Sequence, residues 1–215
     1  MMYLVILSLL GCEYGLTLPS SGGGKVGDLV LKKFKLRERR SILPGSISGP
    51  PVAEPGIYKS QCDDLKDGGP VNGPGCITNT IRCGETLVGH TIGGVNRYNT
   101  RFYEAAFCTP ATTNHDGGDE RIYRLDMPDG DWTAVVSLDS PCADLDVAAI
   151  RWDEGTCPKP NNLINQCEMW PNDKGTREQV RMVSQHETSW YVVVEGKDNE
   201  EGAFSITVQC FPGLG

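Results

Sequence analysis

The chain has 215 residues, which is enough for one domain of ordinary size with appended segments, or for two very small domains. Charged residues make up 22% of the chain and apolar residues 39%, a composition that excludes a disordered protein. The formal net charge of −8 excludes a protein that binds nucleic acid over its whole surface, because phosphate binding needs a basic face. The 26 glycines and 14 prolines predict many turns and few long helices.

Residues 2–10 (MYLVILSLL) form a short apolar stretch that runs into Gly11 and Cys12. Its length suits the hydrophobic region of a signal peptide and is too short to span a bilayer. The tetrapeptide at 9–12 is similar to a bacterial lipobox, in which the cysteine becomes lipidated. We therefore expect residues 1–11 to be a signal peptide and Cys12 to anchor an exported lipoprotein to the outer membrane or cell surface. The alternative is an ordinary cleaved signal, which predicts a secreted protein.

Residues 12–56 differ in character from the rest of the chain. The net charge is +3 over residues 1–56 and −11 over residues 57–215, and Pro-, Gly- and Ser-rich runs flank the basic stretch 25–40. This composition predicts a flexible tether between the anchor and the folded domain. The alternative is a basic amphipathic segment that lies on anionic lipid.

Eight cysteines remain after Cys12, and an even number in an exported chain predicts four disulfides. The chain has no Cys-x-x-Cys motif, and its three histidines lie far from cysteine pairs, which argues against zinc. Spacing favours two pairs that close short loops rich in Gly, Pro and Asn, namely Cys62–Cys76 and Cys157–Cys167. For the four cysteines that remain, the predicted pairs are Cys83–Cys108 and Cys142–Cys210.

From residue 83 onward the pattern is one of short alternating segments separated by Gly, Pro and Asp. The predicted strands are 85–92, 120–127, 132–139, 144–152, 179–185, 189–195 and 203–210. Seven or eight short strands with turns between them are typical of an all-β antiparallel sandwich. No segment between them has helical period and length, so a parallel α/β sheet with crossover helices is excluded.

Several motifs occur in an order that is hard to obtain by chance. They are Cys83-Gly84, Gly-His-Thr (89–91), Asn-Arg-Tyr-Asn (96–99), Cys108, Asp-Glu-Arg-Ile-Tyr (119–123), Asp-Leu-Asp (144–146), Trp-Tyr-Val-Val-Val-Glu-Gly (190–196) and Phe-Ser-Ile-Thr-Val-Gln-Cys (204–210). Together they resemble the bacterial pre-peptidase C-terminal domain in its Cys-rich versions. The resemblance covers residues 83–210 and implies a jelly-roll-like sandwich of the kind appended to secreted proteases and other exported enzymes.

The resemblance divides the chain into a disulfide-linked extension at 57–82, the sandwich at 83–211 and a tail at 212–215. The family usually accompanies a catalytic domain, for which this chain has no room. The sequence also lacks a Gly-x-Ser-x-Gly elbow, a His-Glu-x-x-His motif and a phosphate-binding glycine loop. We therefore expect a protein that is not an enzyme.

Two features predict binding. Asp144 and Asp146 lie two residues apart on a predicted strand, so both carboxylates share one face, and oxygen ligands of this kind suit Ca²⁺. Collagen-binding modules related to the resembled family also bind calcium. The alternative is that these aspartates reflect turn chemistry.

The second feature is a set of aromatic residues in loops, which can stack on sugar rings or grip an extended peptide. The candidates for such a platform are Tyr98, Tyr103, Trp152 and Trp170. The alternative is that these rings cap the open ends of the sandwich core. We expect a non-catalytic surface module that binds an extracellular polysaccharide or protein. A structural subunit of an envelope assembly and an accessory domain of a separate hydrolase are the alternatives.

Overall fold

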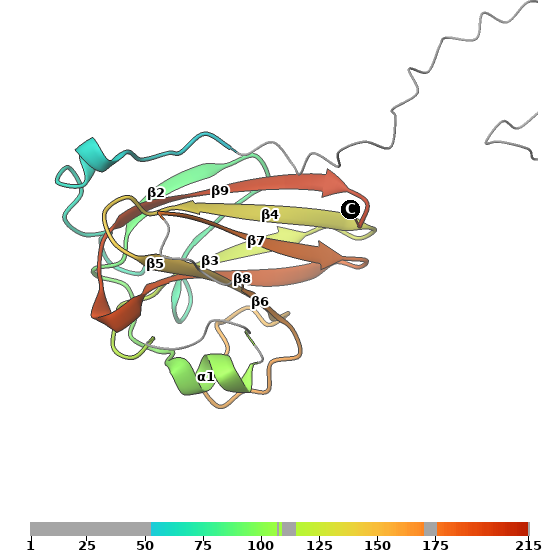
Figure 1. Cartoon of the computed structure of the whole chain (residues 1–215). Helices are drawn as coiled ribbons and strands as arrows, with labels where there is room; N and C mark the ends of the chain where they lie inside the picture. Colours follow the sequence, from blue (N-terminus) through green and yellow to red (C-terminus); the bar gives the residue numbers. More distant parts are fainter. Residues whose placement is uncertain (1–52, 107, 109–114, 170–175, 215) are drawn as a thin grey trace, which may run out of the picture. The chain divides into compact units, whose positions relative to one another are not determined.

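The computed structural model describes residues 53–106, 108, 115–169 and 176–214, within a compact unit that runs from Ser48 to Gly215. These residues form nine strands in two sheets packed face to face (Figure 1). The five-stranded sheet has the order β1 (Ile77–Thr80), β3 (Arg121–Met127), β8 (Thr188–Gly196), β5 (Leu145–Arg151), β6 (Cys167–Met169). The four-stranded sheet has the order β2 (Thr86–His90), β9 (Ala203–Pro212), β4 (Trp132–Asp139), β7 (Arg177–Ser184).

The predicted all-β sandwich is confirmed, and seven of its strands fall on the segments that alternate in the sequence. All pairings among the described strands are antiparallel except that of β1 with β3. No helix within the described residues is long and apolar enough to cross a membrane.

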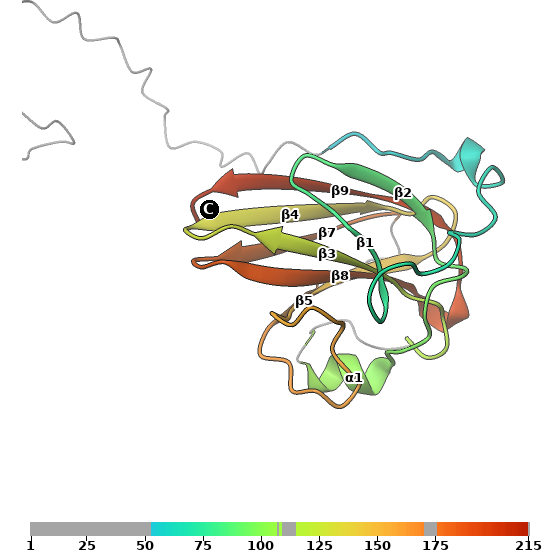
Figure 2. The same cartoon turned by 180° about the vertical axis from the view of Figure 1, so that it is seen from behind.

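The five-stranded sheet is covered on both faces, which explains the unbroken apolar run from Trp190 to Val194 in the middle of β8. Trp190, Val192 and Val194 pack into the core between the two sheets. Tyr191 and Val193 point the other way and pack into a second apolar cluster. This second cluster lies under the helix α1 (Thr100–Ala105) and the loop that leads from β5 to β6 (Figure 2). All nine residues of β8 are therefore buried.

Three elements are missing from the sequence prediction. The helix α1 has six residues, which is too short to show a helical period, and β6 has three. The strand β1 lies within the predicted extension 57–82, yet it pairs in parallel with β3 and so joins the sheet. Two short 3-10 turns, η1 (Lys59–Gln61) and η2 (Lys197–Asn199), complete the described elements.

Four disulfides staple the sandwich, but all four predicted pairings are wrong. The observed pairs are Cys62–Cys142, Cys76–Cys157, Cys83–Cys210 and Cys108–Cys167. The partners are separated by 59 to 127 residues in the sequence. Each bond joins segments that only the folded sheets bring together, so loop length along the chain carries no information about them. Four disulfides are typical of proteins from an oxidising, extracellular compartment.

Candidate functional site

A groove of about 520 Å³ lies at the end of β5, beside the loop that joins β5 to β6. Its lining contains one aromatic ring and five side chains that can form hydrogen bonds. The lining residues are Arg151, Trp152, Asp153, Glu154, Asn165 and Gln166. A concave surface with an aromatic ring and convergent polar groups makes this groove a candidate ligand site.

The indole ring of Trp152 is half-buried and is held in one orientation. Its Nε1–H donates to the carbonyl oxygen of Thr156 at 3.0 Å, and its backbone N–H donates to the carbonyl oxygen of Ser189 at 3.0 Å. Its apolar part packs against the cluster beneath α1. An aromatic ring that is fixed before a ligand arrives loses little conformational entropy on binding.

The carboxylate of Asp153 is fixed in the same way. Its Oδ1 accepts hydrogen bonds from the hydroxyl of Thr188 at 2.6 Å and from the backbone N–H of Ser189 at 3.0 Å. The Thr188 hydrogen bond, supported by that of Ser189, holds the pKa of Asp153 below its usual value. Arg151 also donates to the Thr188 hydroxyl through Nε, at 3.1 Å. The groove therefore offers both a charged acceptor and a charged donor.

A second groove of about 360 Å³ shares Asp153 with the first. It is also lined by Arg124, Asp126, Thr188 and Ser189, which are themselves linked. Asp126 accepts from Arg124 Nε at 2.7 Å and from the Ser189 hydroxyl at 2.6 Å. The two grooves together offer a polar surface that extends on both sides of Asp153.

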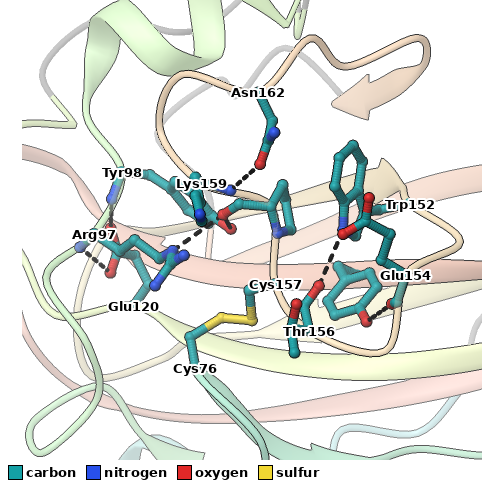
Figure 3. Close-up of a disulfide and its surroundings, with 12 residues drawn as sticks. Cys76, Arg97, Tyr98, Glu120, Trp152, Glu154, Thr156, Cys157, Lys159 and Asn162 are labelled. Carbon is teal, nitrogen blue, oxygen red and sulfur yellow. Dashed lines mark hydrogen bonds between the residues drawn. A yellow bond between two sulfur atoms is a disulfide. The ribbon is translucent and has the colours of Figure 1, made fainter.

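The loop that follows Trp152 is tied to the residue before β1 by the Cys76–Cys157 disulfide. Figure 3 shows this bond with Arg97 and Glu120 on one side and Thr156 and Trp152 on the other. On one side of the bond, Arg97 Nε and the hydroxyl of Tyr98 both donate to the carbonyl oxygen of Pro158, at 3.0 and 2.9 Å. At the next turn, Asn162 Oδ1 accepts from the backbone N–H of Lys159. This loop is therefore held by covalent and hydrogen bonds, with little dependence on regular secondary structure.

Two of the four predicted platform residues are buried, so the prediction is wrong for them. Tyr98 stacks on Phe102 with ring centroids 4.0 Å apart, and Tyr103 meets both rings edge-on. These rings fill the cluster beneath α1 on the outer face of the five-stranded sheet, so they do not cap the open ends of the sandwich core, as the alternative had it. Trp152 lines the groove, whereas Trp170 lies outside the described residues, as does Cys12.

The structure places the predicted calcium ligand Asp146 in a buried ionic cluster. Its Oδ2 lies 3.1 Å from Nε2 of His115 and 3.2 Å from Nζ of Lys197, and its side chain is 2% exposed. Asp144 is partly exposed, and its backbone N–H donates to Glu200. The described residues contain no group of three or more His, Cys, Asp or Glu side chains that could hold a metal ion. The geometry thus gives the calcium prediction no support.

Most of the residues that line the groove could not be predicted from the sequence. The one sequence feature that indicates its position is the predicted strand that ends at Trp152 and is followed by Asp153 and Glu154. Asn165 and Gln166 come from the far end of the loop, and the disulfides that bring them there could not be assigned from spacing.

No protein family model and no curated protein match this chain. Among solved structures, the chain is similar to the pre-peptidase C-terminal domain of a collagenase from Bacillus anthracis. The identity is 15% and the TM-score 0.38, and the match covers 64% of this chain and 99% of that chain. The pre-peptidase C-terminal domain is also the family that the motifs of residues 83–210 resemble.

Proposed function

We propose that this protein is an exported, non-catalytic module that binds an extracellular polysaccharide through the groove beside Trp152. The observation that carries the proposal is the fixed indole ring of Trp152 at a groove whose other lining residues are all polar or charged. Sugar rings present an apolar face that stacks on indole and a rim of hydroxyls that pair with carboxylate, amide and guanidinium groups. Cys12 provides the lipid anchor that holds the module at the cell surface.

The shape of the site favours a polymer over a small molecule. The two grooves share Asp153 and run along the ends of β3, β5 and β8, so a chain of several sugar units contacts both. The side chains there are pre-positioned by hydrogen bonds to one another, among them those of Asp126, Asp153 and Thr188. Such preorganisation lowers the entropic cost of binding an extended ligand.

A protein ligand is the second candidate, and one residue favours it. Leu163 lies on the same β5–β6 loop and is 78% exposed. It is the most exposed of the large apolar side chains in the described part of the chain. An exposed apolar side chain on the loop that also carries Trp152 would add apolar contact area to a protein interface. The mutation Leu163→Ala distinguishes the two ligands, because it leaves the polar groove intact.

The test is a pull-down of the oxidised full chain on insoluble cellulose, chitin, peptidoglycan and collagen. We expect retention on one of the three polysaccharides, with affinity reduced about tenfold in Trp152→Ala by the loss of ring stacking. Trp132→Ala is the matched control, since Trp132 is also half-buried but lies on β4, outside the groove lining. Retention that survives Trp152→Ala unchanged, or retention on collagen alone that Leu163→Ala removes, would contradict the polysaccharide proposal.

A further inference from the structure

A third cleft, of about 220 Å³, lies away from Trp152 at the opposite edge of the five-stranded sheet. Its walls come from β1 and β2, which are the edge strands of the two sheets, and from the segment 65–72. Its lining includes Arg121 and Tyr123 of β3. This site has no residue in common with the groove of the proposed function.

Arg121 is fully buried, and its guanidinium group is only partly satisfied. Nε donates to the carbonyl oxygen of His90 at 2.8 Å, while Nη2 donates to those of Gly69 and Ile92 at 2.6 and 2.7 Å. Nη1 is buried and has no hydrogen-bond partner among the described residues. Two of the five guanidinium N–H groups therefore have no acceptor among the described residues.

The charge of Arg121 is also without a close counter-ion. No carboxylate oxygen of the described residues lies within 4 Å of the guanidinium, although Asp67, Asp119 and Glu201 act on it from longer range. A buried cation normally pairs with an anion at hydrogen-bonding distance, because burial removes its hydration. The cleft thus presents an incompletely compensated positive charge.

Two further donors lie in the cleft lining. The hydroxyl of Thr78 is buried and has no partner among the described residues. Nδ1 of His90 accepts the backbone N–H of Ile92 at 3.1 Å, so the proton of the neutral imidazole is on Nε2. The rest of the lining includes the apolar side chains of Leu87 and Val88, and Val88 is 53% exposed.

We propose that this cleft binds a carboxylate group, which accepts hydrogen bonds from Nη1 of Arg121 and from the Thr78 hydroxyl. The aliphatic part of the ligand packs against Leu87 and Val88. A C-terminal amino-acid residue and a uronic acid both carry a carboxylate of suitable size. The apolar wall formed by β2 favours the C-terminal residue.

The test uses the oxidised, ¹⁵N-labelled full chain and four small probes. N-acetyl-L-leucine and glucuronate carry the carboxylate, whereas N-acetyl-L-leucinamide and glucose are their neutral counterparts. We expect millimolar binding of N-acetyl-L-leucine, seen as shifts of the backbone amides of Gly68 and Gly89, and weaker binding of glucuronate. Tighter binding of glucuronate would keep the carboxylate site and assign it to a sugar acid. Equal binding of acid and amide, or no shift at these amides, would overturn the proposal.

Two variants test the contacts without removing Arg121, whose loss would take its hydrogen bonds from the carbonyl oxygens of His90, Gly69 and Ile92. Thr78→Val is nearly isosteric and should weaken N-acetyl-L-leucine about tenfold, the effect of one lost hydrogen bond. Asp67→Asn removes an exposed negative charge that lines the cleft and should tighten binding about threefold. An unchanged affinity in both variants, with shifts still seen in the wild type, would place the carboxylate elsewhere.

Discussion

The hydroxyl of Tyr103 donates a hydrogen bond to Oε2 of Glu195 beneath α1, where both side chains are buried. Burial and the nearby carboxylate of Glu120 raise the pKa of Glu195 to about 9. The pKa of Glu120 is itself raised to about 7, mainly by burial, although its carboxylate accepts the backbone N–H groups of Arg97 and Tyr98. At neutral pH, Glu195 is therefore a protonated acid in the folded protein.

This pair predicts that the protein loses stability as pH rises. In the unfolded chain Glu195 ionises near its ordinary value of 4.5, while in the folded chain it keeps its proton up to about pH 9. The folded state thus binds more protons between these values, and each such carboxyl lowers the free energy of unfolding by up to about 1.4 kcal/mol per pH unit. Urea unfolding at pH 5, 7 and 9 should show a falling midpoint.

The variant Glu195→Gln should flatten this dependence, because an amide mimics the neutral acid and does not titrate. Glu168→Gln is the matched control, since Glu168 is a partly exposed glutamate of β6 and should leave the slope unchanged. A midpoint that rises from pH 5 to pH 9 in the wild type would show that Glu195 is ionised in the folded state.

The Cys76–Cys157 disulfide should affect both stability and ligand binding. Its replacement by two serines releases a loop closed over a separation of 81 residues and should cost about 2–5 kcal/mol of unfolding free energy. It also frees the loop that carries Trp152, so polysaccharide retention should fall. Binding and urea unfolding of the double variant measure the two effects.

The control for this experiment is the double variant in which Cys83 and Cys210 are both replaced by serine. That bond joins the turn before β2 to β9 within the four-stranded sheet and closes a separation of 127 residues, so its loss should destabilise the fold to a similar degree. Retention on the polymer should persist below the unfolding transition. If both double variants bind as the wild type does, the loop does not depend on its disulfide.

The helix α1 depends on a single cap. Oδ1 of Asn99 accepts the backbone N–H of Phe102 at 3.0 Å, and the helix buries Phe102 and Tyr103. Asn99→Ala should therefore lower the unfolding free energy by about 1 kcal/mol, while Asn99→Ser should retain most of it. Chemical denaturation of the three proteins checks the difference, and equal midpoints for the two variants would show that the cap contributes nothing.

The sandwich could be predicted from the sequence because the alternation of apolar and polar residues that marks a strand lies along the strand's own length. In β7, buried and exposed residues alternate as expected, since one face packs on the core and the other meets solvent. The strands 132–139 and 203–210 were located for the same reason, from their apolar alternation. Such patterns depend only on neighbours along the chain.

The second layer over the five-stranded sheet could not be predicted in this way. Tyr98 and Tyr103 looked like exposed loop aromatics because the sequence does not show that α1 folds back on β8. The Cys108–Cys167 bond depends on the same contact, as does the position of Asn165 in the groove. These features are set by contacts between distant segments, and short loops have no periodicity that reveals them.

The position of Asp146 predicts how the protein responds to calcium. Its carboxylate lies against His115 and Lys197 in the interior, so a cation must displace a buried ion pair to reach it. Asp146→Asn removes the carboxylate that faces Lys197 and His115, while the carboxyl of Glu178 stays in the same cluster, and should cost about 3 kcal/mol. Asp129→Asn is the matched control: the Asp129 carboxylate is exposed, lies 3.9 Å from His186 and should contribute less than about 1 kcal/mol.

Thermal unfolding of the wild type should have the same midpoint in calcium and in EDTA. A midpoint raised by calcium in the wild type and in Asp129→Asn, but not in Asp146→Asn, would show that Asp146 leaves its ion pairs to bind the metal.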